Sequence, residues 1–350
     1  MKTNKIKNLY LGWDIGGAHI KLSTIKPNSF SFNIYKCNLW KSTDVLKKIL
    51  HSVCRKYKRG FNVINIITMS GEMCDIFDSR NQGVKHILEI FKNINKENYV
   101  FSTKKPFFFK LSEKINPESI SSANWFATAK FLETKVNNAI AVDVGSTTTD
   151  IIVIKKGVCI NKNYSDFSRL QSSELIYMGI LRTPIHAVTK EIYSGQKKFS
   201  IIPENFSNMS DVYRILSDIK PKIDYSENCD SKNKSYRNSL VRFSRIIGFD
   251  YHSKNERIVI NLAKKIKLSQ KNYLMQKITH TLQQHFQSKE SVNIIGIGIG
   301  SFLIEEISKK IKMSYKDFNS FCQGGRKQLF LPSDIAPAYS ISTLFKLRNE

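Results

Sequence analysis

The sequence lacks the cysteine arrangements that mark metal centres and disulfide scaffolds. Its six cysteines are spread over 350 residues, none forms a CxxC pair, and no histidine stands at metal-ligand spacing from a cysteine. In a chain of this length, such a pattern is more typical of a reduced cytosolic protein. We therefore expect neither a disulfide framework nor a zinc site.

Long apolar segments are also missing. No apolar run approaches the ~20 residues that a membrane-spanning helix requires, and the basic segment Met1–Tyr10 is not followed by the apolar stretch of a signal peptide. We expect a cytoplasmic protein that does not enter a membrane.

Acidic residues are scarce, with 29 Asp and Glu against 55 Lys and Arg, which gives a net charge of +26. A nucleic-acid partner is one explanation, but the lysines occur as scattered pairs such as Lys47–Lys48 and Lys264–Lys265, not as one block. Lys, Asn and Ile are frequent throughout, as an AT-rich genome favours. We expect solvated surface lysines without a nucleic-acid partner, whose field attracts a small anionic substrate. The oligomeric state is not predicted.

The chain contains no Walker A motif, but it contains an internal repeat. Residues 11–21 (LGWDIGGAHIK) can be laid over residues 140–150 (IAVDVGSTTTD), so that Asp14 matches Asp143 and Gly16 matches Gly145. Apolar residues precede each Asp and a β-branched run follows each turn, a pattern that indicates strand, tight turn, strand. A single copy would be read as an ordinary hairpin, whereas two copies at matching offsets favour a shared function.

The chemistry of the repeat suits a phosphate. Turn glycines let backbone N–H groups approach an anion closely, and an Asp at a strand end can hold Mg²⁺ through water. We expect two such turns to grip one phosphorylated small molecule, with Asp14 and Asp143 as metal ligands. The candidate phosphate-binding residues of the two turns are Gly16, Gly17, Lys21, Gly145, Ser146, Thr147, Thr148 and Thr149.

A third glycine cluster lies near the end of the sequence. The buried-strand pattern 292–295 is followed by Gly296, Gly298 and Gly300, and then by an amphipathic helix. Strand, glycine-rich turn and helix N-terminus form an anion or nucleotide site. The cluster is not a complete Rossmann fingerprint, and a plain tight turn between strand and helix is the alternative.

The pattern of elements predicts two lobes. The first spans 1–135 and ends in a helix that Asn116 caps, with Ile120, Ala127 and Phe131 on one face. The second spans 136–350, with a polar insertion or loop near 190–239, a helical region near 255–286 and a final helix at 337–347. The final helix is expected to pack near the lobe interface.

These motifs resemble the two phosphate motifs and the adenosine motif of the actin/sugar-kinase/Hsp70 superfamily, and its hydantoinase/oxoprolinase branch in particular. The segments 68–72, 122–130, 166–170 and 174–184 further resemble the tetrahydromethanopterin-linked one-carbon-transfer pathway proteins. Archaeal members of that family are (4-{4-[2-(γ-glutamylamino)ethyl]phenoxymethyl}furan-2-yl)methanamine synthases. The resemblance implies an α/β chain with two ribonuclease H-like lobes of the actin-like ATPase fold around a central cleft.

The resemblance also implies a reaction in methylofuran biosynthesis, which in a bacterium would belong to methylotrophy. A furanylmethyl diphosphate loses pyrophosphate to the phenol oxygen of γ-glutamyltyramine, with Mg²⁺ as cofactor and without a requirement for ATP. Asp14 and Asp143 would then be catalytic through the metal, and Glu72, Asp150 and Asp166 are candidates for the acceptor of the phenol proton. Arg169, Arg182 and Thr183, with the three glycines of the last cluster, are further candidates for binding phosphate or the glutamyl carboxylate.

Each side chain also has a purely structural interpretation. Arg169 and Arg182 could form structural ion pairs, Glu72 could cap a helix, and Lys21 could be a solvated strand residue. An ATP-dependent small-molecule kinase or an oxoprolinase-like hydrolase would use the same fold, because function depends on the site and not on the fold.

Overall fold

The computed structural model describes residues 7–219, 223–224, 227–324 and 328–349. The chain divides into two compact units. Unit 1 contains the described residues of 1–139, 152–172 and 317–350, and unit 2 contains those of 140–151 and 173–316. Each unit has its own apolar core and is described by itself.

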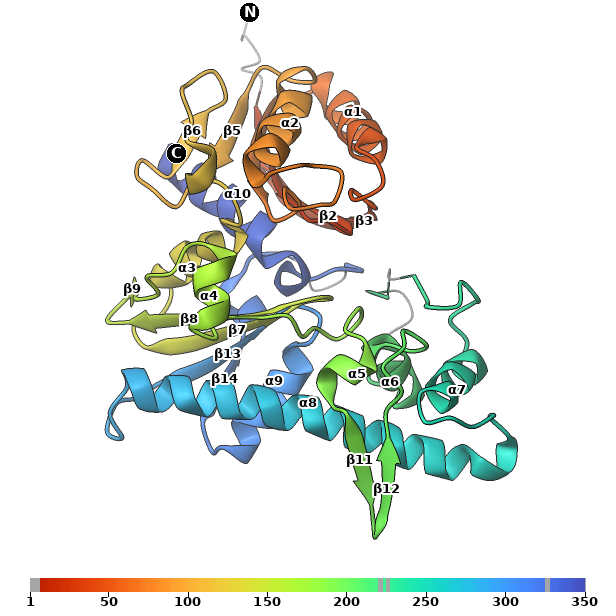
Figure 1. The fold of residues 1–350 in the computed structure, drawn as a ribbon. Helices are drawn as coiled ribbons and strands as arrows, with labels where there is room; N and C mark the ends of the chain where they lie inside the picture. Colours follow the sequence, from red (N-terminus) through yellow and green to blue (C-terminus); the bar gives the residue numbers. More distant parts are fainter. Residues whose placement is uncertain (1–6, 220–222, 225–226, 325–327, 350) are drawn as a thin grey trace, which may run out of the picture. The chain divides into compact units, whose positions relative to one another are not determined.

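Unit 1 is built on a six-stranded sheet in the order β3-β2-β1-β4-β5-β6 (Figure 1). The first three strands form an antiparallel meander, and β1, β4 and β5 run parallel. Seven of the eight residues of β1 are buried, since this strand is central and covered on both faces. The strands are β1 (Asn8–Ile15), β2 (His19–Lys26), β3 (Ser29–Lys36), β4 (Asn62–Met69), β5 (Asn98–Phe101) and β6 (Phe108–Lys110).

Helices cover both faces of this sheet. Residues of α1 and α2 join Trp13 and Ile15 of β1 in one apolar cluster, whereas α10 packs on β1, β2, β4 and α3. A Cβ atom at Gly12 would stand 2.2 Å from the Ala338 carbonyl oxygen, so this glycine admits α10 close to β1. The helices are α1 (Asp44–Lys58), α2 (Arg80–Lys92), α3 (Asn124–Glu133), α4 (Asp166–Gln171) and α10 (Ala336–Asn349), with short 3₁₀ turns η1 (Pro117–Ser119), η4 (Phe318–Phe321) and η5 (Pro332–Ile335).

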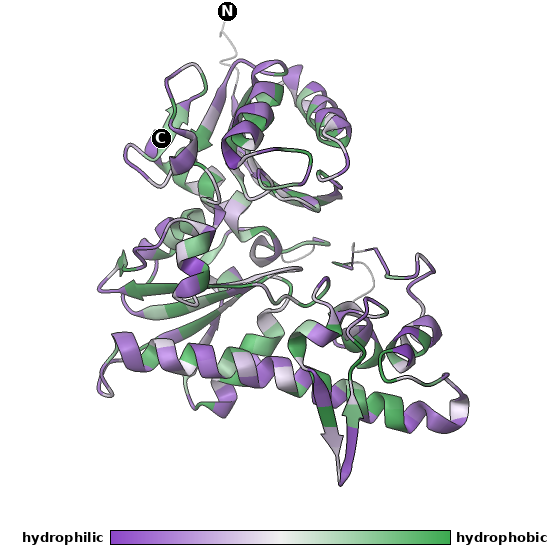
Figure 2. Cartoon of the chain, viewed as in Figure 1, coloured by the Kyte–Doolittle hydropathy of each residue, from purple (hydrophilic) through white to green (hydrophobic). Residues whose placement is uncertain are grey.

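Unit 2 is built around a second sheet, in the order β10-β8-β7-β13-β14, with β9 paired to β8. The division between the units passes through the hairpin of β7 and β8. Strands β7, β8 and β13 are rich in apolar residues, whereas β14 has the polar sequence SYKD, and α8 alternates between polar and apolar residues along its length (Figure 2). The strands are β7 (Ala139–Val144), β8 (Thr149–Lys155), β9 (Val158–Cys159), β10 (Leu175–Ile176), β13 (Asn293–Ile297) and β14 (Ser314–Asp317).

The helices of unit 2 include one of 30 residues, α8 (Glu256–His285). Residues of α6, α7, α8 and α9 pack against Ile140, Val142 and Val144 of β7 in one core. The others are α5 (Ile185–Val188), α6 (Met209–Ile215), α7 (Tyr236–Arg245), α9 (Ser301–Lys310) and the 3₁₀ turn η3 (Ser253–Asn255). No helix in the described part of the chain is both long and apolar enough to cross a membrane.

The stretch that we expected to be a polar insertion or loop contains regular structure. Its described residues form the hairpin of β11 (Glu191–Ser194) and β12 (Lys197–Ser200), then α6 and the start of α7. Buried charges explain its polar sequence, because the Asp211 carboxylate pairs with Arg214 at 2.6 Å and with Arg242 at 2.7 Å. Residues 220–222 and 225–226 of this stretch lie outside the described residues.

One helix differs from the expectation. The helix that we expected from Asn116 to Phe131 is interrupted, because Ser122 adopts a left-handed backbone with φ of 51° between η1 and α3. Residues 152–172 and 317–350 group with unit 1, since α10 packs on the first sheet. The division into lobes at residues 135/136, with α10 near their interface, stays a prediction.

Candidate functional site

The first glycine turn joins β1 to β2 in unit 1. The Gly16 N–H donates to the His19 carbonyl oxygen at 3.0 Å and closes the turn. Asp14, two residues earlier and 3% exposed, lies opposite Lys21 in the strand register and pairs with it at 3.6 Å. Within the described chain, the N–H groups of Gly17 and Ala18 donate to no other residue, so they can serve an anion.

The second glycine turn joins β7 to β8 in unit 2 and is closed by the same kind of backbone hydrogen bond. The Gly145 N–H donates to the Thr148 carbonyl oxygen at 2.9 Å, as Gly16 does to His19. In the described part of the chain, the N–H groups of Ser146, Thr147 and Thr148 donate to no other residue. The predicted repeat is therefore also a repeat of turn geometry.

A glycine from a later segment of the chain packs against each turn. A Cβ atom at Gly71 would stand 3.0 Å from the Gly16 carbonyl carbon and 3.1 Å from the Gly17 nitrogen. A Cβ atom at Gly179 would stand 2.5 Å from the Ser146 carbonyl carbon and the Thr147 nitrogen. Neither glycine was assigned a role from the sequence, because the need for a missing side chain appears only when two distant segments meet.

Hydrogen bonds hold the second turn in place. The Ile180 N–H donates to the Gly145 carbonyl oxygen at 3.1 Å, and those of Leu181 and Arg182 donate to the Ser146 carbonyl oxygen at 3.1 and 2.9 Å. The Gly179 carbonyl oxygen accepts from the buried Gln270 amide at 3.0 Å. The carbonyl side of the turn is thereby fixed, while its N–H groups stay available.

The side chains around the second turn differ in how much of their hydrogen-bonding capacity the protein itself uses. The exposed Arg182 donates to the Thr147 hydroxyl oxygen at 3.4 Å, which places its guanidinium beside the turn. The Thr149 hydroxyl instead donates to the Met178 carbonyl oxygen at 2.6 Å, and the Thr183 hydroxyl accepts from the Gly179 N–H at 2.8 Å. Both threonines, which we predicted to contact the ligand, therefore make bonds within the protein.

One glycine of the third cluster lies against the second turn's carboxylate. Gly298 has φ of +80°, and a Cβ atom there would stand 2.4 Å from Oδ1 of Asp143. Gly296 instead makes room for the Tyr315 ring, and Gly300 packs against Val144 and donates to its carbonyl oxygen at 2.9 Å. Only Gly298 of the three predicted residues directly shapes the surroundings of Asp143.

The residues near Asp143 fit a magnesium ion that a phosphorylated ligand helps to bind. Among the described residues, no group of three or more His, Cys, Asp or Glu side chains could hold a metal by itself. Magnesium commonly takes one or two carboxylates together with substrate phosphates and water. Asp143, in the space that Gly298 leaves, would supply one such carboxylate, and its role as a metal ligand stays a prediction. Asp14 lies in unit 1, so its sharing of one ion or ligand with Asp143 stays a prediction.

A carboxylate cluster follows β4 in unit 1. Glu72 is fully buried, and its Oε1 accepts from the hydroxyls of Ser121 at 2.6 Å and Ser122 at 2.9 Å. The Ser122 hydroxyl also lies 3.3 Å from Oδ2 of Asp166, which pairs with Arg80 at 3.1 Å. In the described structure, Oε2 of Glu72 has no hydrogen-bond partner. Glu72 and Asp166, two of the predicted proton acceptors, therefore both lie within hydrogen-bond distance of the Ser122 hydroxyl.

This cluster depends on two features that sequence reasoning missed. The left-handed Ser122 directs its hydroxyl between the carboxylates, and Gly83 of α2 admits the Glu72 backbone, whose carbonyl oxygen would be 2.2 Å from a Cβ atom there. Arg169, also in unit 1, stacks its guanidinium over the Trp125 ring at 4.1 Å. Asp150, the third candidate proton acceptor, pairs in register with Leu175 in unit 2, whereas the Glu72 cluster belongs to unit 1.

Comparison with known proteins identifies a family to which the chain is similar. The hydantoinase/oxoprolinase family model matches residues 64–322. The chain is 28% identical over 304 residues to the (4-{4-[2-(γ-L-glutamylamino)ethyl]phenoxymethyl}furan-2-yl)methanamine synthase of Methanocaldococcus jannaschii, which covers 86% of this chain and 89% of the archaeal protein. It is 30% identical over 222 residues to the synthase of the same name from Methanococcus vannielii, covering 62% and 96%.

A solved structure shows the fold. The nucleotide-free structure of acetone carboxylase, from work on ATP-dependent acetone carboxylation, superposes with a TM-score of 0.56 at 9% identity, covering 96% of this chain and 70% of that one. The predicted α/β actin-like ATPase fold is confirmed. The named archaeal relatives support a related biosynthetic role.

Proposed function

The chain belongs to the hydantoinase/oxoprolinase family, and on that premise we propose that it joins a furanylmethyl diphosphate to γ-glutamyltyramine in the assembly of a methylofuran-type cofactor. The observation that carries the proposal is the 28% identity to an archaeal synthase over 86% of the chain, because that relative's name describes the ether product. The unused N–H groups of the glycine turns add support, since the leaving group is an anion.

The reaction breaks one carbon–oxygen bond and forms another. The methylene carbon of the furanylmethyl group loses its bond to the diphosphate oxygen, which keeps the electron pair and leaves as pyrophosphate. The phenol oxygen of γ-glutamyltyramine bonds to that carbon and gives up its proton. The protein must therefore stabilise negative charge on pyrophosphate, receive a proton from the phenol, and keep water from the carbon.

The second turn is assigned to the diphosphate. The N–H groups of Ser146, Thr147 and Thr148 are available as donors, and Arg182 adds a cation beside Thr147. Guanidinium groups bind phosphate through paired N–H donors, which suits a leaving group whose charge grows during the reaction. Asp143 would hold Mg²⁺, which when bound offsets the charge of the departing pyrophosphate.

The Glu72 cluster is assigned to the phenol proton. A phenol has a pKa near 10, so a carboxylate acts first as a hydrogen-bond acceptor and takes the proton only as the new bond forms. Oε2 of Glu72 is a buried acceptor without a partner among the described residues, and Ser122 bridges Oε1 to Asp166. This arrangement gives Glu72 and Asp166 a joint role, with Ser122 as the positioning residue.

Product formation without ATP is the direct test. Purified protein is incubated with a furanylmethyl diphosphate, γ-glutamyltyramine and Mg²⁺, and pyrophosphate and the ether are measured by a coupled assay and mass spectrometry. We expect equal amounts of both products, and none with Asp143→Ala. If no ether forms, and ATP is instead consumed in a way that depends on a small acceptor, a kinase or hydrolase replaces this proposal.

A further inference from the structure

A pocket in unit 1 lies where β5 ends, at the same C-terminal end of the parallel strands as the first glycine turn. The register places Asp14 of β1 beside Thr68 of β4, and Ile67 of β4 beside Val100 of β5. Phe101, the residue after Val100, therefore continues the row of Asp14 and Thr68. Two strand spacings make the backbone separation between Asp14 and Phe101 about 10 Å.

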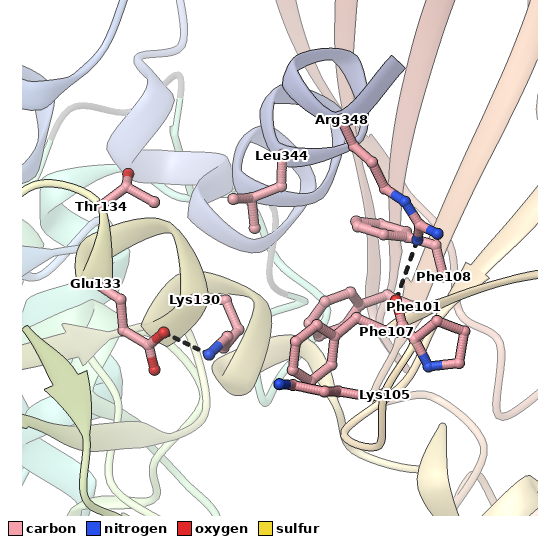
Figure 3. Close-up of a pocket in the computed structure, with 10 residues that line it drawn as sticks. Phe101, Lys105, Phe107, Phe108, Lys130, Glu133, Thr134, Leu344 and Arg348 are labelled. Atoms are coloured by element: carbon pink, nitrogen blue, oxygen red, sulfur yellow. Dashed lines mark hydrogen bonds and ion pairs between the residues drawn. The ribbon is translucent and has the colours of Figure 1, made fainter.

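The pocket has an apolar wall that includes three phenylalanines. It has a volume of about 430 Å³, and its apolar wall consists of Phe101, Pro106, Phe107, Phe108 and Leu344 (Figure 3). Phe107 has a left-handed backbone with φ of 68°, which a bulky residue adopts only where its surroundings impose it. A pocket of this size and lining accommodates one small ligand with a flat apolar ring.

The polar groups of the pocket carry excess positive charge. Lys130 pairs with Glu133 and lies 5.0 Å from the Phe107 ring centre. Arg348 donates one hydrogen bond, to the Pro106 carbonyl oxygen at 3.1 Å, and its other N–H groups have no partner in the described structure. Lys105 is exposed and has no ion-pair or hydrogen-bond partner among the described residues. Two cations are therefore available to an anionic ligand.

We propose that this pocket binds an aromatic acceptor that also carries a carboxylate, with its ring among the phenylalanines and its carboxylate at Lys105 and Arg348. The inference rests on the proposed function, in which γ-glutamyltyramine has both groups.

A charge-matched pair of double variants tests the proposal on the full chain. Lys105→Gln/Arg348→Gln removes the two pocket cations, and Lys58→Gln/Arg59→Gln removes two exposed cations of the same types at the end of α1. Binding of γ-glutamyltyramine and of N-acetyltyramine, which is uncharged and lacks the carboxylate, is measured by calorimetry. We expect the pocket variant to bind γ-glutamyltyramine about tenfold more weakly, to bind N-acetyltyramine as before, and to keep its affinity for pyrophosphate.

A further variant tests the aromatic wall. Phe108→Ala should weaken the binding of both ligands, with its fold checked by circular dichroism. Equal losses in the two double variants would mean that only the general positive field matters and would overturn the proposal, as would unchanged binding in the pocket variant. If the wild-type protein forms no ether but shows the expected binding pattern, the proposed function fails and the acceptor pocket stands.

Discussion

The two glycine turns are closed by the same kind of backbone hydrogen bond, but the side chains around them differ. In the first, Asp14 is buried and paired with Lys21, and no side-chain hydroxyl occurs among Gly16, Gly17 and Ala18. In the second, Asp143 is only half-buried, and three hydroxyl residues follow Gly145 beside Arg182. The second turn therefore adds hydroxyl groups and the Arg182 cation to its backbone donors, whereas the cation at the first turn, Lys21, is paired with Asp14. A metal-ligand role for Asp143 stays a prediction.

The largest expected effect is on the free energy of unfolding, and it differs between Gly179 and Gly71, which pack against the two turns. Gly179→Ala places a Cβ atom 2.5 Å from turn backbone atoms that cannot move aside, whereas Gly71→Ala meets first the movable Leu39 side chain at 2.8 Å. We expect losses in the free energy of unfolding of about 3 and about 1 kcal/mol respectively. Urea denaturation measures both, with Gly60→Ala as control, since no atom lies within 4 Å of a Cβ there. Equal losses would contradict the asymmetry.

The next effect concerns the two aspartates. Asp143→Asn should lower the rate of ether formation at a fixed Mg²⁺ concentration by about 100-fold, because the ligand charge at the second turn is lost. Asp14→Asn should lower it by only about tenfold, because Lys21 already neutralises Asp14 at 3.6 Å. Titration of Mg²⁺ provides the measurement, and excess metal should partly rescue Asp143→Asn alone. The reverse order of severity would exchange the roles of the turns.

A smaller effect is expected at Arg182. Arg182→Lys keeps the charge but removes the paired donors, and should weaken pyrophosphate binding about fivefold to tenfold. The exposed Arg245 of the same unit provides the control variant Arg245→Lys. Calorimetric titration with pyrophosphate distinguishes them. Equal affinity in all three proteins would remove Arg182 from the second turn's ligand contacts.

The effect that is smallest at neutral pH concerns Cys37 beside the first turn, because it changes the stability of the fold only above pH 9. The Cys37 N–H donates to the Ala18 carbonyl oxygen, and burial, aided by nearby Cys74, raises the pKa of the Cys37 thiol from 9.0 to about 11. The folded state keeps the proton longer than the unfolded state, so stability is full below pH 9 and falls as pH rises toward about 11. Cys37→Ala should show a shallower decline in urea midpoint over this window. Parallel curves would show that Cys37 contributes nothing.

The local patterns of the sequence allowed the turns and most of the elements to be predicted. Asp14, Gly16 and their counterparts Asp143 and Gly145 are close neighbours along the chain, so their spacing directly encodes a strand, turn and strand. The helical region near 255–286 appears as α8, and the final helix as α10, because an apolar face repeats every three to four residues. The break at Ser122 was missed, since nothing in its local composition opposes a helix.

The sequence by itself therefore determined the two phosphate-type turns and most of the helices and strands, because those depend on contacts between near neighbours and on periodicity. The fold followed from the family resemblance that the motifs carry. Only the tertiary structure decided that Gly71 and Gly179 pack against the turns, that Ser122 links Glu72 to Asp166, and that the aromatic segment 101–108 lines a pocket together with residues of α3 and α10. Those arrangements join residues tens to hundreds of positions apart, and no spacing rule along a chain specifies which distant segments will meet.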